Sequence, residues 1–397
     1  MNTDITLFGK TNWRNKANVF GILQADRLLH MYIIGKTGTG KSTMLKTMFL
    51  QDIAAGRGAC LLDPHGDLVQ DVLACIPEER RADIIHFDMP NPDLNLRYNP
   101  FKRVSYEKRS LVASGIMDVF KKLWADAWGV RLEHILRNCI LALLDQQEAS
   151  LADIPSILLD KNFRAEAIKN IENEAVKEFW EKEFVVYKYY DFLPVLNKVG
   201  GMLAHPVIKR VLFSNKNEVY LRRAMDQQKI ILVNLSKGHL GEDASHMLGA
   251  LFVSSISAAA FSRADIEEET RVPYMLFADE FHNVTTLSLV TMLSELRKFK
   301  VGMILAHQYF HQLEEDVRHA VLGNVGTIIA FRVGADDAYY LTKEMQGIFA
   351  DSFISHANYH MYVKLMIKGV PSKAFSAESL PYSIIRDYAG RRPSPYA

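Results

Sequence analysis

The sequence predicts an α/β fold in which a mainly parallel sheet is interrupted by an inserted all-α domain. Three observations support this class. Short apolar runs alternate with helical segments in residues 26–100, helical spacing alone fills residues 101–225, and apolar runs of strand length return in residues 226–335. Alternation of strands and helices is typical of a parallel sheet covered on both faces. We therefore expect two separate parts of the chain to build one sheet.

The first core part is predicted over residues 26–100, after an N-terminal extension at residues 1–25. It begins with a strand, "HMYIIG", followed by a helix, "STMLKTMFLQDIAAG", that ends at Gly56. The runs "GACLLD" and "ADIIHFD" predict two more strands, with the helix "DLVQDVLACI" between them. This order is expected for strands that run parallel and are joined by helices.

The all-α insertion is predicted over residues 101–225. In "RLEHILRNCILALLD" the apolar residues recur at spacings of three and four, as on one face of a helix. Residues 226–380 then form the second core part, with strands at "KIILVNL", "YMLFADE", "VGMILAHQ" and "GTIIAFRVG". Residues 381–397 are predicted to be a C-terminal tail, and its end, "GRRPSPYA", is expected to be mobile.

Composition limits the classes of function. The 397 residues include 47 Lys and Arg against 46 Asp and Glu, for a net charge of +1. A protein that binds nucleic acid through bulk charge is usually more basic, so any such contact must come from local patches such as a ring lumen. The three cysteines, Cys60, Cys75 and Cys139, lack zinc-site spacing, and their low, odd number fits a reducing cytoplasm.

No membrane segment is expected. The N-terminus lacks the apolar core of a signal peptide. The most apolar stretch, "MLGALFVSSISAAAF" at 247–261, is shorter than the roughly 20 residues that span a bilayer, so we interpret it as a buried helix.

A phosphate-binding loop follows the first predicted strand. Its sequence matches GxxxxGK[ST] with a strand before it and a helix after it, which is the context that the motif requires. Glycines let backbone N–H groups surround a phosphate, and the helix adds its positive N-terminal end. Lys41 is predicted to reach the β- and γ-phosphates of ATP, Ser42 to bind Mg²⁺, and Thr43 to contact the α-phosphate. The predicted nucleotide-binding residues are Gly35, Lys36, Thr37, Gly38, Thr39, Gly40, Lys41, Ser42 and Thr43.

An acidic pair ends the predicted strand "YMLFADE". Asp279 is predicted to hold Mg²⁺ together with Ser42, and Glu280 to activate the attacking water as a general base. The alternative is a pair of solvated loop carboxylates. A water-activating glutamate also argues against a small-molecule kinase. Gln308 ends another strand, where its amide would sense the γ-phosphate or position water; the alternative is an exposed loop residue.

The stretch "DPHGDL" after the second strand presents Asp63, His65 and Asp67 at alternate positions. A metal site is one interpretation of this spacing. The other is turn chemistry, since Asp-Pro and His-Gly-Asp are typical of loops.

These motifs together resemble a known family. The set is "GKTGTGKST", "LLDPHGDLV", "FADEFHN" and "ELRKFKVGMILAHQ". It is similar to the HerA/FtsK superfamily of ring-forming DNA-pumping ATPases, most of all to conjugative type IV secretion coupling proteins (TraD/TraG-like) and bacterial HerA-like relatives. The likeness extends from about residue 18 to about residue 380. It implies a RecA-like P-loop core and a homo-oligomeric ring, expected to be a hexamer.

The resemblance also implies a role for an arginine that acts on the nucleotide of the neighbouring subunit. The matching residue is Arg297, and the alternative is an arginine on a helix surface beside Lys298. Arg332 is a second candidate for a phosphate or subunit-interface contact. The insertion resembles the all-α domain of coupling proteins, where Arg131, His134 and Arg137 would either meet phosphate or lie on a solvated helix face.

Two departures from the family affect the expected location. Coupling proteins usually carry N-terminal transmembrane helices and HerA proteins an N-terminal β-barrel, whereas about 20 residues precede the core of this sequence. The expectation is a cytoplasmic motor core, with a position peripheral to a membrane secretion complex as the alternative.

Contact with DNA is predicted in the loop "NLSKGHLGED", where Lys237 and His239 flank Gly238. A basic residue in a short glycine loop would touch backbone phosphate without reading sequence. The alternative is an ordinary strand-to-helix loop.

The predicted function is ATP hydrolysis coupled to DNA translocation, with ATP and Mg²⁺ as cofactors. Expected partners are DNA, other copies of the chain, and a relaxase, nuclease or secretion-channel protein. Two rivals are kept: a nucleotide-dependent scaffold, and a secretion ATPase that moves protein rather than DNA.

Overall fold

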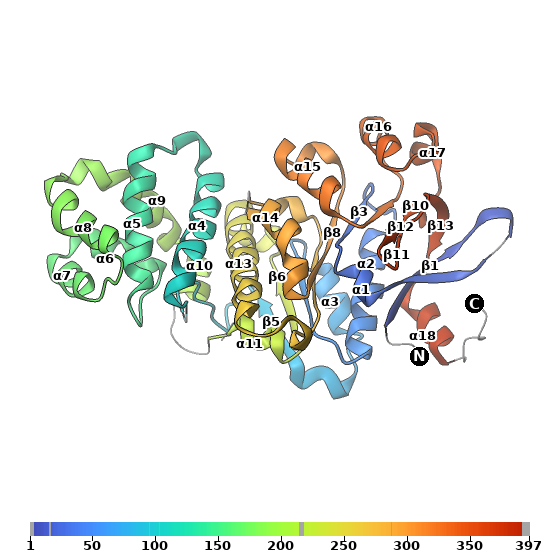
Figure 1. Ribbon diagram of the computed structural model, residues 1–397, viewed down its shortest axis with the longest axis horizontal. Helices are drawn as coiled ribbons and strands as arrows, with labels where there is room; N and C mark the ends of the chain where they lie inside the picture. The colour runs from blue at the N-terminus through green and yellow to red at the C-terminus, as the bar shows by residue number, and fades with distance from the viewer. Residues whose placement is uncertain are drawn as a thin grey trace. The chain divides into compact units, whose positions relative to one another are not determined.

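The computed structural model describes residues 4–15, 17–94, 96–102, 104–213, 218–286 and 288–390 (Figure 1). The chain divides into two compact units. The sheet unit consists of Met1–Phe87, Arg223–Leu235 and Arg263–Ala397, and the helical unit of Asp88–Arg222 and Ser236–Ser262. The predicted end "GRRPSPYA" lies outside the described residues except for its first glycine.

The sheet unit is built on one mixed, mostly parallel sheet. Within the described residues its strand order is β2-β1-β13-β10-β9-β3-β8-β7-β4-β6-β5. Strands β9, β3, β8, β7, β4 and β6 pair in parallel, and β2, β1, β13 and β10 form an antiparallel extension beside β9. The two parts of the core that the insertion separates therefore interleave in one sheet, as the sequence predicts.

The parallel strands are the ones that the sequence predicts. Nearly every side chain on them is buried, because helices cover both faces, so each appears in the sequence as a continuous apolar run. Their bounds are β3 Met31–Ile34, β4 Ala59–Asp63, β6 Ile230–Asn234, β7 Tyr274–Ala278, β8 Val301–His307 and β9 Thr327–Ala330. Strand β5, at the edge of the sheet, is Ile84–Asp88.

The antiparallel extension was not predicted. Strands β1 (Ile5–Thr11) and β2 (Val19–Leu23) lie where the sequence predicted only an extension. Strands β10 (His360–Lys364) and β13 (Phe375–Ser379) join them from the other end of the chain, with Gly9 opposite Ser379. A small hairpin of β11 (Met366–Ile367) and β12 (Val370–Pro371) connects β10 to β13. These strands mix buried and half-exposed residues, which makes their sequence signal weaker.

Helix α2 (Lys41–Ala54) packs its apolar residues into the sheet core and places the phosphate-binding loop at its N-terminus. Gly56, with a φ of 78°, follows the helix where the sequence predicted its end. The other helices of this unit are α1 Gln24–Arg27, α3 Asp67–Leu73, α14 Ser288–Glu295, α15 Glu315–Asn324, α16 Ala335–Glu344, α17 Ala350–Ser355 and α18 Tyr382–Gly390. Helix α11 (Leu221–Asp226) crosses the boundary between the two units along the chain.

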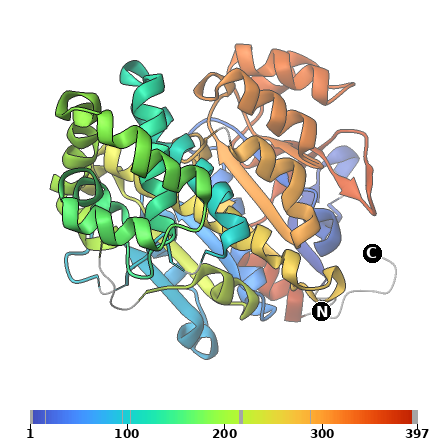
Figure 2. The same ribbon diagram turned by 60° about the vertical axis from the view of Figure 1, so that its left-hand side comes forward.

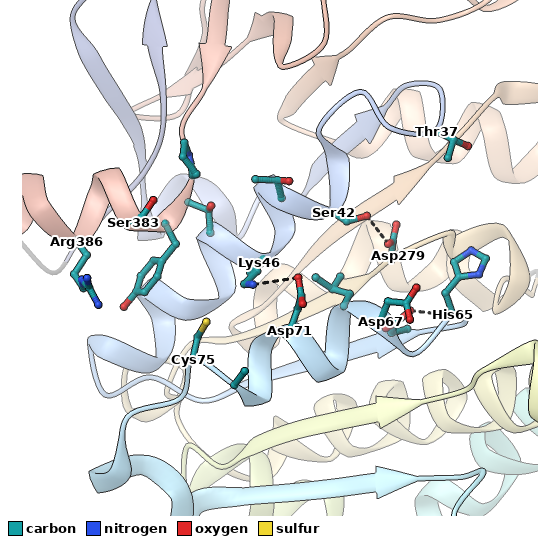
Figure 3. A pocket seen from close by; sticks show the side chains of 17 residues that line it. Thr37, Ser42, Lys46, His65, Asp67, Asp71, Cys75, Asp279, Ser383 and Arg386 are labelled. Atoms are coloured by element: carbon teal, nitrogen blue, oxygen red, sulfur yellow. Dashed lines mark hydrogen bonds and ion pairs between the residues drawn. The ribbon is translucent and has the colours of Figure 1, made fainter.

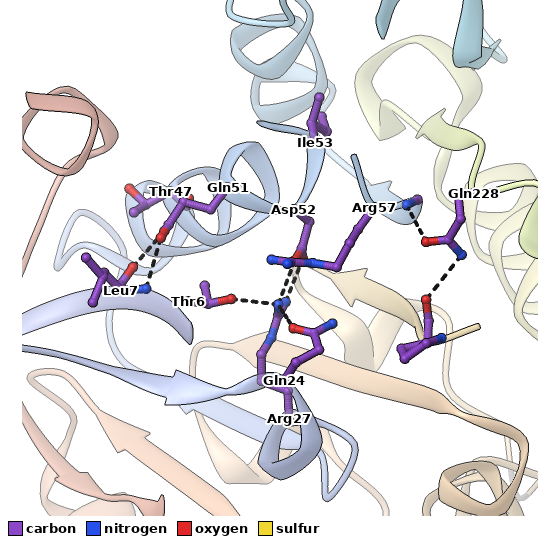
Figure 4. Close-up of polar contacts among 12 residues, drawn as sticks. Thr6, Leu7, Gln24, Arg27, Thr47, Gln51, Asp52, Ile53, Arg57 and Gln228 are labelled. Atoms are coloured by element: carbon purple, nitrogen blue, oxygen red, sulfur yellow. Dashed lines mark hydrogen bonds and ion pairs between the residues drawn. The ribbon is translucent and has the colours of Figure 1, made fainter. Parts of the chain in front are cut away.

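The C-terminal half of α2 is fixed by a buried ion pair (Figure 4). The Arg27 guanidinium donates two hydrogen bonds of 2.7 Å to the Asp52 carboxylate, and both side chains are fully buried. Arg57 donates to the same carboxylate, and Arg27 also donates to Thr6 on β1. A buried charge is tolerated when its hydrogen bonds are satisfied in this way. The network thus holds α2, the helix that follows the phosphate-binding loop, against β1 and α1.

Apart from Asp88, the last residue of β5, the helical unit contains no strand among its described residues, in line with the predicted all-α character. Helices α4, α5, α6 and α9 pack against one another (Figures 1 and 2). The apolar face predicted in "RLEHILRNCILALLD" is the buried face of α5. The bounds are α4 Tyr106–Leu123, α5 Val130–Leu144, α6 Ile154–Leu159, α7 Lys161–Lys169, α8 Glu174–Glu178, α9 Tyr189–Ala204, α10 Pro206–Leu212, α12 Lys237–Leu240 and α13 Glu242–Ser262.

Helix α13 contains the most apolar stretch of the sequence. It is long and apolar enough to cross a membrane by composition, but 72% of that stretch is buried inside the protein. It packs along α4, and Tyr98 donates a 2.6 Å hydrogen bond to its Leu251 carbonyl. The stretch is therefore a core helix of the helical unit, as the sequence predicts.

The unit boundaries differ from the predicted ones at three places. The helical unit begins at Asp88 rather than at residue 101, and it also takes in α12 and α13 from the predicted second core part. Residues 382–390, predicted to belong to a tail, form helix α18, which contacts α2.

Candidate functional site

The phosphate-binding loop joins β3 to α2. Gly38 and Gly40 have φ values of 76° and 124°, which other residues rarely adopt, so both glycines are needed for the shape of the loop. The Lys41 Nζ donates hydrogen bonds to the carbonyl oxygens of Gly35 (2.6 Å) and Lys36 (3.3 Å). Burial lowers the pKa of Lys41, and the neighbouring Glu280 and Asp279 carboxylates oppose that shift. The loop therefore has the form and the lysine that the sequence predicts.

A segment distant in the sequence supports this loop. The backbone N–H of Tyr359 donates a 2.8 Å hydrogen bond to the carbonyl of Thr39. A Cβ atom on Gly40 would lie 3.0 Å from the Tyr359 ring and 3.1 Å from that of Phe331. Arg332 lies beside the loop, because its carbonyl accepts from the N–H of Lys36 and its guanidinium contacts the His356 carbonyl at 3.3 Å. No local pattern around Tyr359 signals this role.

The acidic pair follows β7, whose neighbours are β4 and β8. The Ser42 hydroxyl donates to Asp279 Oδ2 at 3.1 Å, so the two residues predicted to hold Mg²⁺ lie together. Burial, with Glu280 and Asp63 nearby, raises the pKa of Asp279 to about 6, while Lys41 and Ser42 oppose the rise. This carboxylate is therefore held at a cost in free energy that a bound cation would offset.

Glu280 is held in an unusual conformation. Its φ of 42° and ψ of 49° place it in the left-handed region, and its side chain is buried. Glu280 Oε1 accepts a 2.8 Å hydrogen bond from Gln308 and lies 4.0 Å from the Lys41 Nζ. Glu280 Oε2 lies 3.6 Å from the Nδ1 of His282. Backbone conformations of this kind are concentrated at functional sites, where the surrounding structure imposes them.

Gln308 connects the acidic pair to the phosphate-binding loop. While its amide nitrogen donates to Glu280, its amide oxygen accepts a 3.1 Å hydrogen bond from Thr37. The structure thus brings together Thr37, Lys41, Ser42, Asp279, Glu280 and Gln308 at the carboxyl edge of β3, β7 and β8. Sequence reasoning named each of these residues, although it did not foresee the link between Thr37 and Gln308.

Arg297 lies at the amino-terminal ends of the parallel strands, opposite the carboxyl ends at which the site lies. It is exposed in the turn Leu296–Phe299, directly before β8, whereas Gln308 follows β8. It is near His30, which precedes β3; burial lowers the pKa of His30 to about 4, and Arg297 adds a smaller repulsion. Because β8 has seven residues, Arg297 is roughly 20 Å from the phosphate-binding loop of its own chain. The structure does not place Arg297 in the site of the same chain.

The predicted DNA-contact residues lie in the helical unit. The stretch "NLSKGHLGED" is not simply a loop, because Lys237–Leu240 forms the short helix α12. The Lys237 Nζ lies 3.6 Å from the Glu242 carboxylate, and His239 Nδ1 is 3.0 Å from the Ser236 hydroxyl. Both predicted residues therefore have partners within their own helical segment.

Basic residues of α5 also have acidic partners. Arg131 pairs with Asp191 at 2.6 Å, His134 with Glu183 at 2.9 Å, and Arg137 with Glu133 at 3.3 Å. These contacts agree with the solvated-face alternative for this helix.

The "DPHGDL" stretch forms a turn. The Asp63 carboxylate accepts hydrogen bonds from the backbone N–H groups of His65 (2.9 Å) and Val69 (3.0 Å). A carboxylate that accepts from nearby backbone groups is the turn chemistry that the sequence offered as one interpretation. The turn positions α3 next to α2.

A groove of about 910 Å³ continues from the phosphate-binding loop (Figure 3). One end is lined by Thr37, Ser42 and Asp279, and the other by residues of α18 such as Ser383 and Arg386. The sides come from α2 and α3, where Lys46 and Asp71 form a 3.1 Å ion pair. Sequence reasoning missed the α18 residues, because they were assigned to the tail.

We expect Asp279→Asn to stabilise the nucleotide-free protein at neutral pH. Because the pKa of this carboxyl rises from 3.8 to about 6 on folding, its ionisation opposes folding. The opposition is absent below the unfolded pKa, grows as pH rises toward 6, and reaches roughly 3 kcal/mol above it. Thermal unfolding should show a clear gain in Tm at pH 7.5 that shrinks at pH 4.5. An equal gain at both pH values would contradict this.

Comparison with known proteins identifies the family. The profile described as "Type IV secretion-system coupling protein DNA-binding domain" matches residues 19–348. No curated protein sequence matches the chain.

Solved structures of TrwB and of VirB4 share the fold at low identity. The bacterial conjugative coupling protein TrwBdeltaN70 is 14% identical with a TM-score of 0.64, covering 91% of this chain and 87% of its own. VirB4 of Thermoanaerobacter pseudethanolicus is 13% identical with a TM-score of 0.64, covering 95% and 97%. TrwB has also been solved with ADP and Mg²⁺, at 14% identity, a TM-score of 0.63 and the same coverage as TrwBdeltaN70. The profile match and the shared fold confirm the resemblance, and the chain belongs to the type IV secretion-system coupling protein family.

Proposed function

We propose that this chain is an ATPase that works as a ring of identical subunits and moves DNA. One observation carries the proposed hydrolysis of ATP. Phosphate-binding, metal-binding and water-activating groups meet at a single edge of the sheet, linked by the hydrogen bonds of Ser42 to Asp279 and of Gln308 to both Thr37 and Glu280. A pocket that only binds nucleotide would not need a buried, oriented glutamate beside it.

The triphosphate would bind in the phosphate-binding loop. Backbone N–H groups of residues 38–43 and the N-terminal end of α2 supply partial positive charge, and Lys41 adds a full charge. The Lys41 ammonium already lies against the loop, bonded to its carbonyl groups, so a small rotation would direct it to the β- and γ-phosphates. Thr43, on the first turn of α2, lines the groove beyond the loop and would contact the α-phosphate.

The Ser42 hydroxyl and the Asp279 carboxylate fit Mg²⁺. Both are oxygen ligands and lie 3.1 Å apart, and the pKa of Asp279 is raised by burial and, to a smaller extent, by the nearby Glu280 and Asp63 carboxylates. These two residues would hold the ion, which neutralises charge on the phosphates during transfer.

Glu280 would take the proton of the attacking water. One carboxylate oxygen is held by Gln308, which fixes the orientation of the group, and the second remains available at 3.6 Å from His282. Since Gln308 also accepts from Thr37 in the phosphate-binding loop, movement of that loop on nucleotide binding would shift Glu280 as well. Gln308 would thus position the general base according to the state of the loop.

The position of Arg297 supports assembly into a ring. It is exposed at the amino-terminal ends of the strands, on the side of the sheet away from its own phosphate-binding loop. It can therefore reach a nucleotide only on a neighbouring copy. There its guanidinium would neutralise charge on the transferred phosphoryl group. We propose that each site is completed by Arg297 of the next subunit, in a ring that we expect to be hexameric.

DNA as the moved substrate is proposed on the family description, which names a DNA-binding domain. The net charge of +1 means that contacts must be local, and Lys237 and His239 remain our candidates for backbone phosphate. A relaxase, a nuclease or a secretion channel is the proposed partner, and a cytoplasmic or membrane-peripheral location the proposed setting.

We expect Lys41→Ala to abolish ATP hydrolysis and weaken Mg·ATP binding roughly 10- to 150-fold, because a charge-assisted hydrogen bond to phosphate is lost. Lys343→Ala on α16 removes an exposed lysine outside the site and serves as the matched control. Steady-state hydrolysis and equilibrium binding would be measured on both variants. Hydrolysis by Lys41→Ala at the wild-type rate would overturn the proposed function.

A further inference from the structure

The groove that starts at the phosphate-binding loop continues along α2 and α3, and α18 forms its far end. From α18 it is lined by Tyr382, Ser383 and Arg386. We propose that this end binds the base and ribose of the nucleotide, with the Tyr382 ring as the stacking surface for the base. The inference rests on the proposed function, since it extends the same nucleotide site.

The direction of the groove fits a bound nucleotide. It leads from Ser42 past Thr43 and Thr47, which lie on adjacent turns of α2 and both line it. Ser42 and Thr47 are separated by roughly 7 Å along the helix axis, at 1.5 Å per residue. With Thr43 at the α-phosphate, the ribose would lie beside this stretch of α2 and the base beyond it. Tyr382 is the residue that the groove offers there with an aromatic surface.

The charges along the groove also indicate which part of the nucleotide lies near α18. Between the loop end and α18, the wall carries Asp71 on α3, which is paired with Lys46. A carboxylate there would repel a polyphosphate chain but accept a hydrogen bond from a ribose hydroxyl. Phosphates therefore belong at the loop end, and the sugar and base belong between α2, α3 and α18.

The start of α18 is held firmly enough to form a binding surface. Leu380 donates its backbone N–H to Phe8 on β1, and its carbonyl accepts a 3.2 Å hydrogen bond from the Thr47 hydroxyl. Ile385 is 2% exposed and anchors the first turn of the helix. Tyr382 is thus attached to the same helix, α2, that begins at the phosphate-binding loop.

The chemistry of the three α18 residues matches a nucleoside. Aromatic rings stack on bases with little regard to base identity, and a guanidinium or hydroxyl can donate to ring nitrogens and ribose oxygens. Arg386 is exposed, and no hydrogen bond or ion pair engages its side chain within the described part of the chain. Tyr382 is half-buried, with its pKa raised by burial in a site that it shares with Arg386 and Cys75.

The test compares a nucleotide with a ligand that has only its phosphates. Binding of Mg·ADP and of Mg·tripolyphosphate would be measured by titration calorimetry for the wild type, Tyr382→Ala, Tyr382→Phe and Ile384→Ala. Ile384 is 46% exposed on the same helix and does not line the groove, so its replacement is the matched control. Tyr382→Ala should weaken Mg·ADP about tenfold or more, as expected for loss of one stacked base.

The other variants and ligand decide what such a loss means. Tyr382→Phe and Ile384→Ala should bind Mg·ADP like the wild type, and all four proteins should bind Mg·tripolyphosphate equally. Unchanged Mg·ADP binding by Tyr382→Ala would overturn the assignment and leave the proposed function intact. Equal losses for both ligands would also overturn it, since they indicate a structural effect. A wild type that bound neither ligand would overturn the proposed function itself, and this assignment with it.

Discussion

Glu280→Gln is expected to lower ATP hydrolysis by about 10³-fold while the protein still binds Mg·ATP, because the amide cannot accept the proton of the attacking water. The substitution keeps the size of the side chain, and the carbonyl oxygen of the new amide can still accept from Gln308. Binding should therefore remain within a few-fold of the wild-type value. Single-turnover hydrolysis and nucleotide binding on the same preparation would separate the two effects.

The matched control is Glu295→Gln. This glutamate pairs with Lys298 on the surface at the opposite edge of the sheet, so its replacement should leave hydrolysis unchanged. If Glu280→Gln hydrolysed ATP at a near-normal rate, the role of general base would have to pass to another group. Equal loss of binding and hydrolysis would instead show that Glu280 is needed for the shape of the site.

Arg297→Ala is expected to slow hydrolysis by about 10³-fold or more, although the residue lies far from the phosphate-binding loop of its own chain. The physical reason is the loss of the guanidinium that, in the proposed ring, would neutralise the transferring phosphoryl group in the neighbouring site. Lys298→Ala, on the adjacent exposed residue, is the matched control and should be nearly silent. Loss of activity in both variants would indicate general damage to the surface.

Mixing experiments show whether Arg297 acts between subunits. Arg297→Ala subunits keep an intact Glu280, and Glu280→Gln subunits keep an intact Arg297. A mixed ring would contain some sites with both groups, so hydrolysis should exceed that of either variant alone. Absence of recovery at every mixing ratio would count against the proposed role.

The parallel core was predictable because its signals are local. Strands such as β3 and β8 are buried on both faces and therefore appear as apolar runs, each ending in the polar residues of the site. Because the carboxyl ends of parallel strands meet at one edge, a strand-end Asp279 and a strand-end Gln308 could be placed near the phosphate-binding loop from the sequence. Helix α5 was equally clear from its spacing.

The antiparallel extension was not predictable in the same way. Strands β1 and β13 pair although they lie near opposite ends of the sequence, and nothing in either segment indicates that it pairs with the other. Strand β10 alternates buried and half-exposed residues, so it lacks the apolar run that marks the core strands. The support of the phosphate-binding loop by Tyr359, and the contribution of α18 to the groove, depend on this pairing and were missed with it.

Within the site, residue types were easier to foresee than their couplings. The sequence identifies Gln308 as a polar strand end, but its simultaneous contacts with Thr37 and Glu280 depend on the order β3-β8-β7 in the sheet. For Lys237, the sequence shows a lysine beside glycine, and only the structure shows the pairing with Glu242. Non-local contacts decided both cases.

The central claim, that this chain is a DNA-stimulated ATPase ring, is tested most directly by one combined measurement. Steady-state ATPase of the purified chain would be recorded alone, with single-stranded DNA and with double-stranded DNA, together with the mass of the protein in solution. We predict strong stimulation of hydrolysis by at least one form of DNA, together with a ring-sized species. The Glu280→Gln variant should lose the hydrolysis and keep the ring-sized species. A ring whose ATPase rate does not change on addition of DNA would contradict the claim. That result is expected of a scaffold or of a protein-moving ATPase.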